Sequence, residues 1–243
     1  MKKSVKSVVN NKNKNKSKNN LWVISVGGSR IIPEEVDSVF VKKFHDLVKK
    51  HPTQKFVAVT GGGSVARKYI KGLKILHKKT KTQSKMGIAV TRLNASFLMR
   101  VFGAPANETL PKSMKKTKDL LEKNHIVFCG ALRFNPRQTS DGTSADLAAY
   151  LKCPFINITN VQGIYTSNPK TNKSAKFIKH MTWKAFNQKA QKIKYKAGQH
   201  FVLDQDASKT IMKKKIPTYI VGSLSDVDNI ISNKPFKGSL IYG

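Results

Sequence analysis

The sequence predicts an α/β fold with a mainly parallel β-sheet that helices cover on both faces. Three observations predict it. Short, continuously apolar segments recur along the chain, several of them run into glycine-rich or polar loops, and the stretches between them show helical spacing of apolar residues. Hydrophobic residues make up 39% of the 243 residues, which is enough for a packed core and excludes wholesale disorder.

The first half of the chain begins with a buried strand. Residues 21–26 form an apolar run that Gly27 and Gly28 close. Residues 34–50 carry apolar side chains at helical spacing, with acids at the front and lysines at the end, so they predict a helix. Residues 55–60 predict a second strand, which three consecutive glycines end. The other elements predicted in this half are helices at 64–78 and 86–102 and a strand at 126–129.

The second half continues the same alternation, and the chain has no internal repeat. The predicted helices are 141–151, 182–191, 207–215 and 226–232, and the predicted strands are 155–159, 218–221 and 239–242. No proline- or serine-rich linker interrupts residues 21–243, so we predict a single domain there. Residues 1–20 are rich in Lys and Asn and lack an apolar period, which predicts a disordered extension.

Composition excludes several classes of protein. No apolar run approaches the ~18 residues that cross a bilayer, which argues against a membrane protein. The first 20 residues lack the apolar core of a secretory signal. The two cysteines, Cys129 and Cys153, lie in apolar stretches and predict buried, reduced thiols. We therefore expect a cytoplasmic protein.

The charge is strongly basic. The chain has 46 Lys and Arg against 13 Asp and Glu, a net charge of +33, but only six of the basic residues are Arg. Lysine is spread along every segment, whereas nucleic-acid readers use Arg and cluster their charge. This pattern favours a compositional bias, or adaptation to a salty cytoplasm, over nucleic-acid binding. The charge still attracts anions, which suits a phosphate-bearing substrate.

Two glycine-rich loops predict a phosphate site. Gly27, Gly28 and Ser29 follow the first strand, and residues 61–64 follow the second. Glycine lets backbone N–H groups approach phosphate oxygens, and a following helix adds partial positive charge. Neither loop has the spacing of a P-loop or of a dinucleotide fingerprint. Arg67 lies within about a turn of the second loop, where a guanidinium can hold a phosphate bidentately.

Two polar segments follow later strands. Residues 135–141 precede a predicted helix, whose start would carry the Thr139 and Ser140 hydroxyls and the Asp141 carboxyl. A simple helix cap explains the last two residues but not the whole polar run. Residues 157–169 contain a turn and then Tyr165, which either leans on a purine ring or packs within its loop.

Seven segments, which together span nearly all of residues 21–243, carry a recognisable pattern: 26–29, 61–69, 87–95, 136–141, 158–166, 196–204 and 238–241. Taken in order, they resemble those of the amino-acid-kinase superfamily, and within it the uridylate (UMP) kinases, particularly the archaeal branch. The Thr-Arg-x-Asn-Ala sequence in the third segment points to the UMP kinases.

The resemblance implies transfer of the ATP γ-phosphate to UMP by a three-layer αβα sandwich. It implies that ATP contacts Ser25, Val26, Gly27, Gly28, Ser29, Gly63, Thr159, Tyr165 and Asn168. It implies that UMP contacts Gly62, Arg67, Ser84, Phe134, Asn135, Pro136, Arg137, Gln138, Thr139 and Ser140. The catalytic set that it implies is Gly28, Ser29, Arg67, Asp141 and Asp204.

The resemblance also implies partners and a division into lobes. Mg²⁺ would arrive with ATP and not in an all-protein site. The N-terminal part would hold the acceptor and the dimer contact, and the C-terminal part would hold ATP. UMP kinases of this superfamily are homo-oligomers, commonly hexamers built from dimers, so we expect a dimer-based oligomer.

Four positions depart from the UMP-kinase pattern. Ser84 stands where the family has an acid for the ribose, Gln162 and Asn168 each replace an Asp, and Ser25 replaces a bacterial Lys. Three alternatives therefore remain open. They are a kinase for another phosphate or carboxylate acceptor, a non-enzymatic oxyanion- or nucleotide-binding relative, and an RNA-binding role driven by charge.

Overall fold

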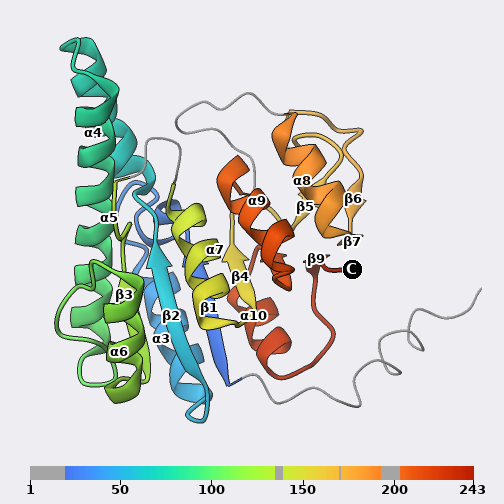
Figure 1. Cartoon of the computed structure of the whole chain (residues 1–243), viewed down its shortest axis with the longest axis horizontal. Coiled ribbons are helices and arrows are strands. Elements are labelled where there is room, and N and C mark those ends of the chain that lie inside the picture. The colour runs from blue at the N-terminus through green and yellow to red at the C-terminus, as the bar shows by residue number, and fades with distance from the viewer. Residues whose placement is uncertain (1–19, 135–138, 170, 193–202) are drawn as a thin grey trace, which may run out of the picture.

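The computed structural model describes residues 20–134, 139–169, 171–192 and 203–243 (Figure 1). Within these residues, seven strands form one sheet in the order β3-β2-β1-β4-β8-β9-β7. The neighbouring strands are parallel except for the antiparallel pair β8 and β9. The strands are β1 (Leu21–Val26), β2 (Lys55–Thr60), β3 (Ile126–Cys129), β4 (Phe155–Ile158), β7 (His180–Met181), β8 (Thr218–Val221) and β9 (Gly238–Ile241).

Helices cover both faces of this sheet, which confirms the predicted three-layer αβα architecture. Figure 1 shows α7 and α9 in front of the sheet and α3 behind it. The helices that pack on one face are α3 (Ser38–Lys50), α5 (Thr80–Phe102) and α10 (Leu224–Ile231). Those on the other face are α6 (Met114–Lys123), α7 (Ser140–Leu151), α8 (Trp183–Gln191) and α9 (Gln205–Lys214).

The central strands are apolar on both sides because both sides are buried. In β1, Trp22, Ile24 and Val26 face the α3 side, whereas Val23 faces the α7 side. Side chains of a strand alternate between faces, so a strand between two helical layers needs apolar residues at nearly every position. Ser25 is the polar exception in this strand, and its side chain is 1% exposed.

Capping residues set the starts of several helices. The predicted helix at 34–50 begins instead at Ser38, because the Asp37 carboxylate accepts a hydrogen bond from the Phe40 N–H at 2.8 Å. Thr139, Thr182 and Asp204 cap α7, α8 and α9 in the same way. The predicted helix at 86–102 begins earlier, at Thr80.

Several short elements have no clear sequence pattern and were not predicted. They are α2 (Gly28–Ile31), α6, β7 and the two-stranded antiparallel pair β5 (Ile164–Tyr165) and β6 (Phe177–Ile178). Helix α4 (Gly63–Ile75), which was predicted to begin at Ser64, packs along α5. The prediction of a disordered extension falls on residues 1–20, of which only Asn20 is described.

Both cysteine thiols lie in the core, as predicted. Burial raises the pKa of Cys129 and of Cys153 to about 12, so neither thiol carries a reactive thiolate near neutral pH. Among the described residues, no helix combines the length and the apolar character needed to span a membrane.

Candidate active site at the carboxyl edge of the sheet

The predicted phosphate loops lie together at one edge of the sheet. Strands β1 and β2 are parallel neighbours in register, with Val26 opposite Thr60, so the loops that follow them start side by side. In parallel α/β sheets, ligands bind beyond this edge. The residues that follow β3, β4 and β8 reach the same edge because those strands run in the same direction.

The two glycine loops touch through their backbones. A Cβ atom added to Gly28 would lie 2.5 Å from the carbonyl oxygen of Gly61, and one added to Gly61 would lie 2.6 Å from the Gly28 nitrogen. Gly63 has a φ of +59°, a conformation that favours glycine. The Ser64 hydroxyl joins the loops again by donating to the Ile32 carbonyl at 2.9 Å. The loops therefore form one rigid unit.

This unit presents two helix starts to the same space. Gly28 is the first residue of α2 and Gly63 is the first residue of α4. The first N–H groups of a helix have no partner within the helix and carry partial positive charge. Two such starts in contact have the geometry that could hold phosphate oxygens, and the phosphate site itself stays a prediction.

Helix α5 holds the second loop from behind, through residues whose roles were not predicted. The Asn94 amide, 1% exposed, donates to the Gly61 carbonyl at 2.7 Å. The Thr60 hydroxyl donates to the Thr91 carbonyl at 2.7 Å, and the Thr91 hydroxyl accepts from the Ala131 N–H at 3.0 Å. The Thr-Arg-x-Asn-Ala segment is thus the scaffold of the loop. The polar residues Thr91 and Asn94 on a buried helix face were its only sequence signal.

Arg92 holds the loop after β3 in the same way, by donating to backbone carbonyls of that loop. Its Nε donates to the Ala131 carbonyl at 3.1 Å and its Nη2 donates to the Leu132 carbonyl at 3.0 Å. The second of these carbonyls lies two residues before Phe134, which is half-buried. The predicted UMP residues Asn135, Pro136, Arg137 and Gln138 fall outside the described residues.

A chain of hydrogen bonds joins β1 to the starts of α7 and α9. The Ser25 hydroxyl donates to Oδ1 of Asp141 at 2.9 Å. The Thr139 hydroxyl accepts from the Asp141 N–H at 3.2 Å and donates to Oδ2 of Asp204 at 2.5 Å. Oδ1 of Asp204 caps α9 by accepting from the Ala207 N–H at 2.6 Å. The structure thus brings both predicted carboxylates into one network.

The two carboxylates differ in what they can still bind. Asp204 is buried, and both of its oxygens accept hydrogen bonds from the protein, including one from the Thr139 N–H at 3.0 Å. Asp141 is half-buried. Burial, together with the like charge of Asp204, raises its pKa from 3.8 to about 7, and the hydrogen bond from Ser25 offsets part of the rise. A nearby cation would favour the ionised form of a carboxyl with this pKa.

The other predicted site residues come from several elements and differ in how exposed they are. Arg67 is exposed on α4, and Ser84 is half-buried on α5, the helix that packs along α4. Thr159 follows β4, where its N–H donates to the Val221 carbonyl at 2.9 Å. The Tyr165 ring lies against Phe177 with 5.4 Å between the ring centres. The Val26 side chain is fully buried, so only its backbone is available to a ligand. Asn168 lies in the exposed loop after β5. Gly62 is the N-cap of α4, and Ser140 is the first residue of α7.

The model of the amino acid kinase family matches residues 20–222. The chain belongs to the amino acid kinase family. Curated relatives include the uridylate kinase of Thermococcus gammatolerans, 34% identical over 82% of this chain and 89% of that protein. Another is the uridylate kinase of Archaeoglobus fulgidus, 33% identical over 90% of this chain and 96% of that protein.

Solved structures of the family have the same fold. The crystal structure of the Archaeoglobus fulgidus uridylate kinase superposes with a TM-score of 0.77 at 28% identity, covering 90% of this chain and 99% of that one. The UMP kinase of Bacillus anthracis gives a TM-score of 0.76 at 18% identity, covering 92% and 96%. This second likeness concerns the fold alone.

Proposed function

We propose that this member of the family is a UMP kinase, which transfers the γ-phosphoryl group of ATP to UMP and yields UDP and ADP. The observation that carries the proposal is that the paired glycine loops follow β1 and β2 at the sheet edge where Asp141 is hydrogen-bonded to Ser25 of β1. The identity of 30–35% to curated uridylate kinases over at least 82% of the chain supports it.

The phosphoryl donor, ATP, and the acceptor, UMP, would bind at different parts of this sheet edge. We propose that ATP lies over the ends of β1 and β4, with Tyr165 near the base. We propose that UMP lies over the end of β2, held by Gly62 and Arg67 and by the segment from Phe134 to Ser140. An oxygen of the UMP phosphate attacks the γ-phosphorus while the bond from that phosphorus to the β-phosphate oxygen breaks, and ADP leaves.

The residues of the chain contribute alignment and charge. The N–H groups at Gly28, Ser29 and Gly63 would hold phosphate oxygens, and Arg67 would neutralise charge on the acceptor phosphate. Asp141 would turn its Oδ2 toward the transferring phosphoryl group, because Ser25 donates to Oδ1. Asp204 would act as a positioning residue, since Thr139 and the α9 start occupy its oxygens.

Magnesium fits this arrangement as a companion of ATP. Among the described residues, no group of three or more His, Cys, Asp or Glu side chains could form a metal cage. Asp141, with its pKa raised partly by the like charge of Asp204, is the carboxylate that would approach a cation bound to the phosphates. The ion would supply charge neutralisation at the β- and γ-phosphate oxygens.

The deciding experiment is a coupled assay of ADP release with Mg·ATP and UMP, CMP, dUMP, AMP or no acceptor. We expect strong turnover with UMP. Turnover only with another acceptor would replace UMP in the proposal. No turnover from the folded protein would favour a non-enzymatic nucleotide-binding role and contradict the kinase.

Replacing Ser84 with aspartate is expected to lower the KM for UMP several-fold. A carboxylate accepts hydrogen bonds from ribose hydroxyls more strongly than a serine hydroxyl does, because its bonds are charge-assisted. The measurement is the KM for UMP at saturating ATP, with the KM for ATP as the internal control. An unchanged KM for UMP would remove Ser84 from the acceptor site.

Replacing Asn94 with alanine is expected to lower kcat/KM about tenfold or more and to destabilise the fold by about 1–3 kcal/mol. The substitution leaves the buried Gly61 carbonyl without its donor at the turn that aligns the phosphates. Asn124→Ala is the matched control, since its amide donates to the Leu120 carbonyl on α6, away from the edge. Equal losses of activity in both variants would contradict a positioning role for Asn94.

We further propose a cytoplasmic homo-oligomer. The two buried free thiols support a reducing compartment. Leu93 and Val101, 63% and 41% exposed, recur at helical spacing on α5 and support a contact between copies through the N-terminal lobe. The division into an acceptor lobe and an ATP lobe is part of the same proposal.

A further inference from the structure

The end of the hairpin that α4 and α5 form stands away from the core. No residue from 67 to 89 is buried, and every residue from 74 to 82 is exposed. We call residues 74–82 the hairpin tip. Figure 1 shows this end of the hairpin extending past the carboxyl edge of the sheet. Packing within the chain's own core therefore does not account for the side chains of the tip.

The hairpin is more basic than the chain as a whole. Eight of the 19 residues from 67 to 85 are Lys or Arg and none is Asp or Glu, whereas the whole chain has 46 basic residues among 243. An even spread of lysine would not give this concentration. None of the ion pairs within the described residues involves a lysine of the tip. The tip lysines are Lys74, Lys78, Lys79 and Lys81.

The tip also presents an adjacent pair of apolar side chains. Ile75 and Leu76 are each 65% exposed, and they lie where α4 ends, directly before the turn at His77. Lys74 and Lys78 flank them in the sequence. Single exposed apolar residues are ordinary, but this pair is flanked by lysines on a projecting turn. The tip thus combines the two attractions that hold a peripheral protein on a membrane, which are burial of apolar side chains and attraction to anionic headgroups.

We propose that the hairpin tip docks on the surface of a bilayer that carries anionic phospholipids. The contact is peripheral, since no helix among the described residues can span a membrane. Clusters of four to eight basic residues on an amphipathic helix are typical of binding to such lipids. A nucleic acid would attract the lysines but offers no apolar phase to Ile75 and Leu76. Contact between the tips of two copies would bring like charges together.

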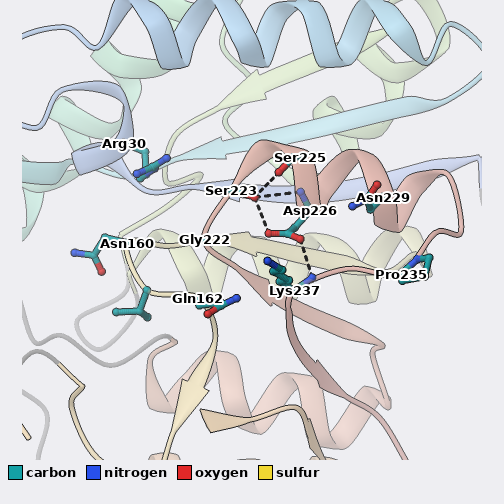
Figure 2. Close-up of a pocket in the computed structure, with 11 residues that line it drawn as sticks. Arg30, Asn160, Gln162, Gly222, Ser223, Ser225, Asp226, Asn229, Pro235 and Lys237 are labelled. Atoms are coloured by element: carbon teal, nitrogen blue, oxygen red, sulfur yellow. Dashed lines mark hydrogen bonds between the residues drawn. The ribbon is translucent and has the colours of Figure 1, made fainter. Parts of the chain in front are cut away.

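Docking through the tip leaves the proposed substrate positions open. Arg67 and Ser84, the proposed UMP residues on the hairpin, lie outside the tip. Eight residues separate Arg67 from Ile75, which is about 12 Å along a helix. None of the residues that line the cavity in Figure 2, between the loop after β4 and the start of α10 where we place ATP, comes from the hairpin. The docking proposal therefore does not depend on the kinase activity.

The test is co-sedimentation of the full chain with vesicles of equal parts phosphatidylglycerol and phosphatidylcholine. The salt is about 0.15 M, where charges more than about 8 Å apart are screened. We expect binding to these vesicles and none to pure phosphatidylcholine. The double variant Ile75→Ser/Leu76→Ser should weaken binding about tenfold or more, because it removes the apolar pair. Lys78→Gln/Lys79→Gln should weaken it by a similar factor, because it removes two charges near the headgroups.

Two control variants remove the same kinds of group elsewhere. Val36→Ser/Val39→Ser removes two exposed apolar side chains at the start of α3. Lys115→Gln/Lys116→Gln removes two exposed lysines on α6, which lies far from the tip in Figure 1. Each control should change vesicle binding less than about twofold. Equal losses in the tip and control variants, or no binding to the anionic vesicles, would overturn the proposal.

Two parallel measurements test the other occupants of the tip. If Lys78→Gln/Lys79→Gln lost binding to poly(U) RNA while its vesicle binding stayed unchanged, the tip would bind nucleic acid. If Ile75→Ser/Leu76→Ser lost an oligomer in sedimentation velocity while its vesicle binding stayed unchanged, the tip would be a contact between copies. Either result would overturn the proposal. Circular dichroism checks that each variant is folded, and all the substituted side chains are exposed.

Discussion

Replacing Asp141 with asparagine is expected to lower kcat for UMP phosphorylation by about 100-fold or more and to make the free protein more stable at pH 8. The amide keeps the size of the side chain and can still accept from Ser25. It lacks the negative charge that we propose aligns the cation on the phosphates. The loss should therefore appear in kcat, with the KM for UMP changed little.

The stability gain follows from the pKa of Asp141, which burial and Asp204 raise from 3.8 to about 7. A carboxyl with a raised pKa in the fold binds its proton more tightly there than in the unfolded chain. Stability is therefore greatest at low pH and falls as the pH rises from about 4 to 7. The half-buried carboxyl is partly screened by solvent, so we expect a gain of about 1–3 kcal/mol for the asparagine variant at pH 8. The gain should be smaller at pH 5.

Melting temperatures at pH 5 and 8, together with steady-state kinetics across that range, check both halves of this prediction. The wild-type kcat/KM should rise with an apparent pKa near 7, the value for Asp141, and the variant should lack this limb. Asp119→Asn, an exposed acid on α6, is the matched control. A kcat within about threefold of the wild type would contradict a catalytic role for Asp141.

Gly28→Ala is expected to lower kcat/KM by about 100-fold or more and to destabilise the fold by about 1–3 kcal/mol. The new methyl group would lie 2.5 Å from the Gly61 carbonyl oxygen, and both partners are backbone, so one of the two loops must move. Displacing a phosphate-binding loop by about 1 Å is enough for a loss of this size. Urea unfolding and steady-state kinetics measure the two effects.

The control for Gly28→Ala is Gly72→Ala on the exposed face of α4, where an added methyl group meets nothing within 4 Å. This variant should keep full activity and gain about 0.5–1 kcal/mol, because alanine favours the helix over glycine. If the two variants behaved alike, the close packing of the glycine loops would have no bearing on activity.

The main sheet could be predicted from sequence because its central strands are apolar on both faces. The segments β1, β2 and β3 read as unbroken apolar runs since helices lie on either side of them, and each was predicted with its observed bounds. Helix α6 was missed because its exposed face is dense in lysine and only Thr117 and Leu121 are buried. The pair β5 and β6 was missed because each strand has two residues, which is too short to show an alternation of apolar and polar side chains.

The candidate site was predictable where chemistry depends on the backbone and less so where it depends on contacts between distant segments. Gly28 and Gly61 are recognisable in the sequence because each follows an apolar strand. Their contact with each other depends on the register of β1 and β2, which the sequence does not show. Asn94 and Arg92 reach carbonyls 33 and 39 residues away, and no local pattern reveals such bonds.

The place of β9 between β8 and β7 has a consequence for how the protein is made. Strand β7 pairs with β9, and β9 is also the antiparallel neighbour of β8, so this side of the sheet cannot close before residues 238–241 are available. During translation, β3, β2 and β1 can assemble on the ribosome while the free edge of β8 stays open. Such an edge is a template for wrong pairing, so we expect the nascent chain to be most prone to misassembly before β9 emerges.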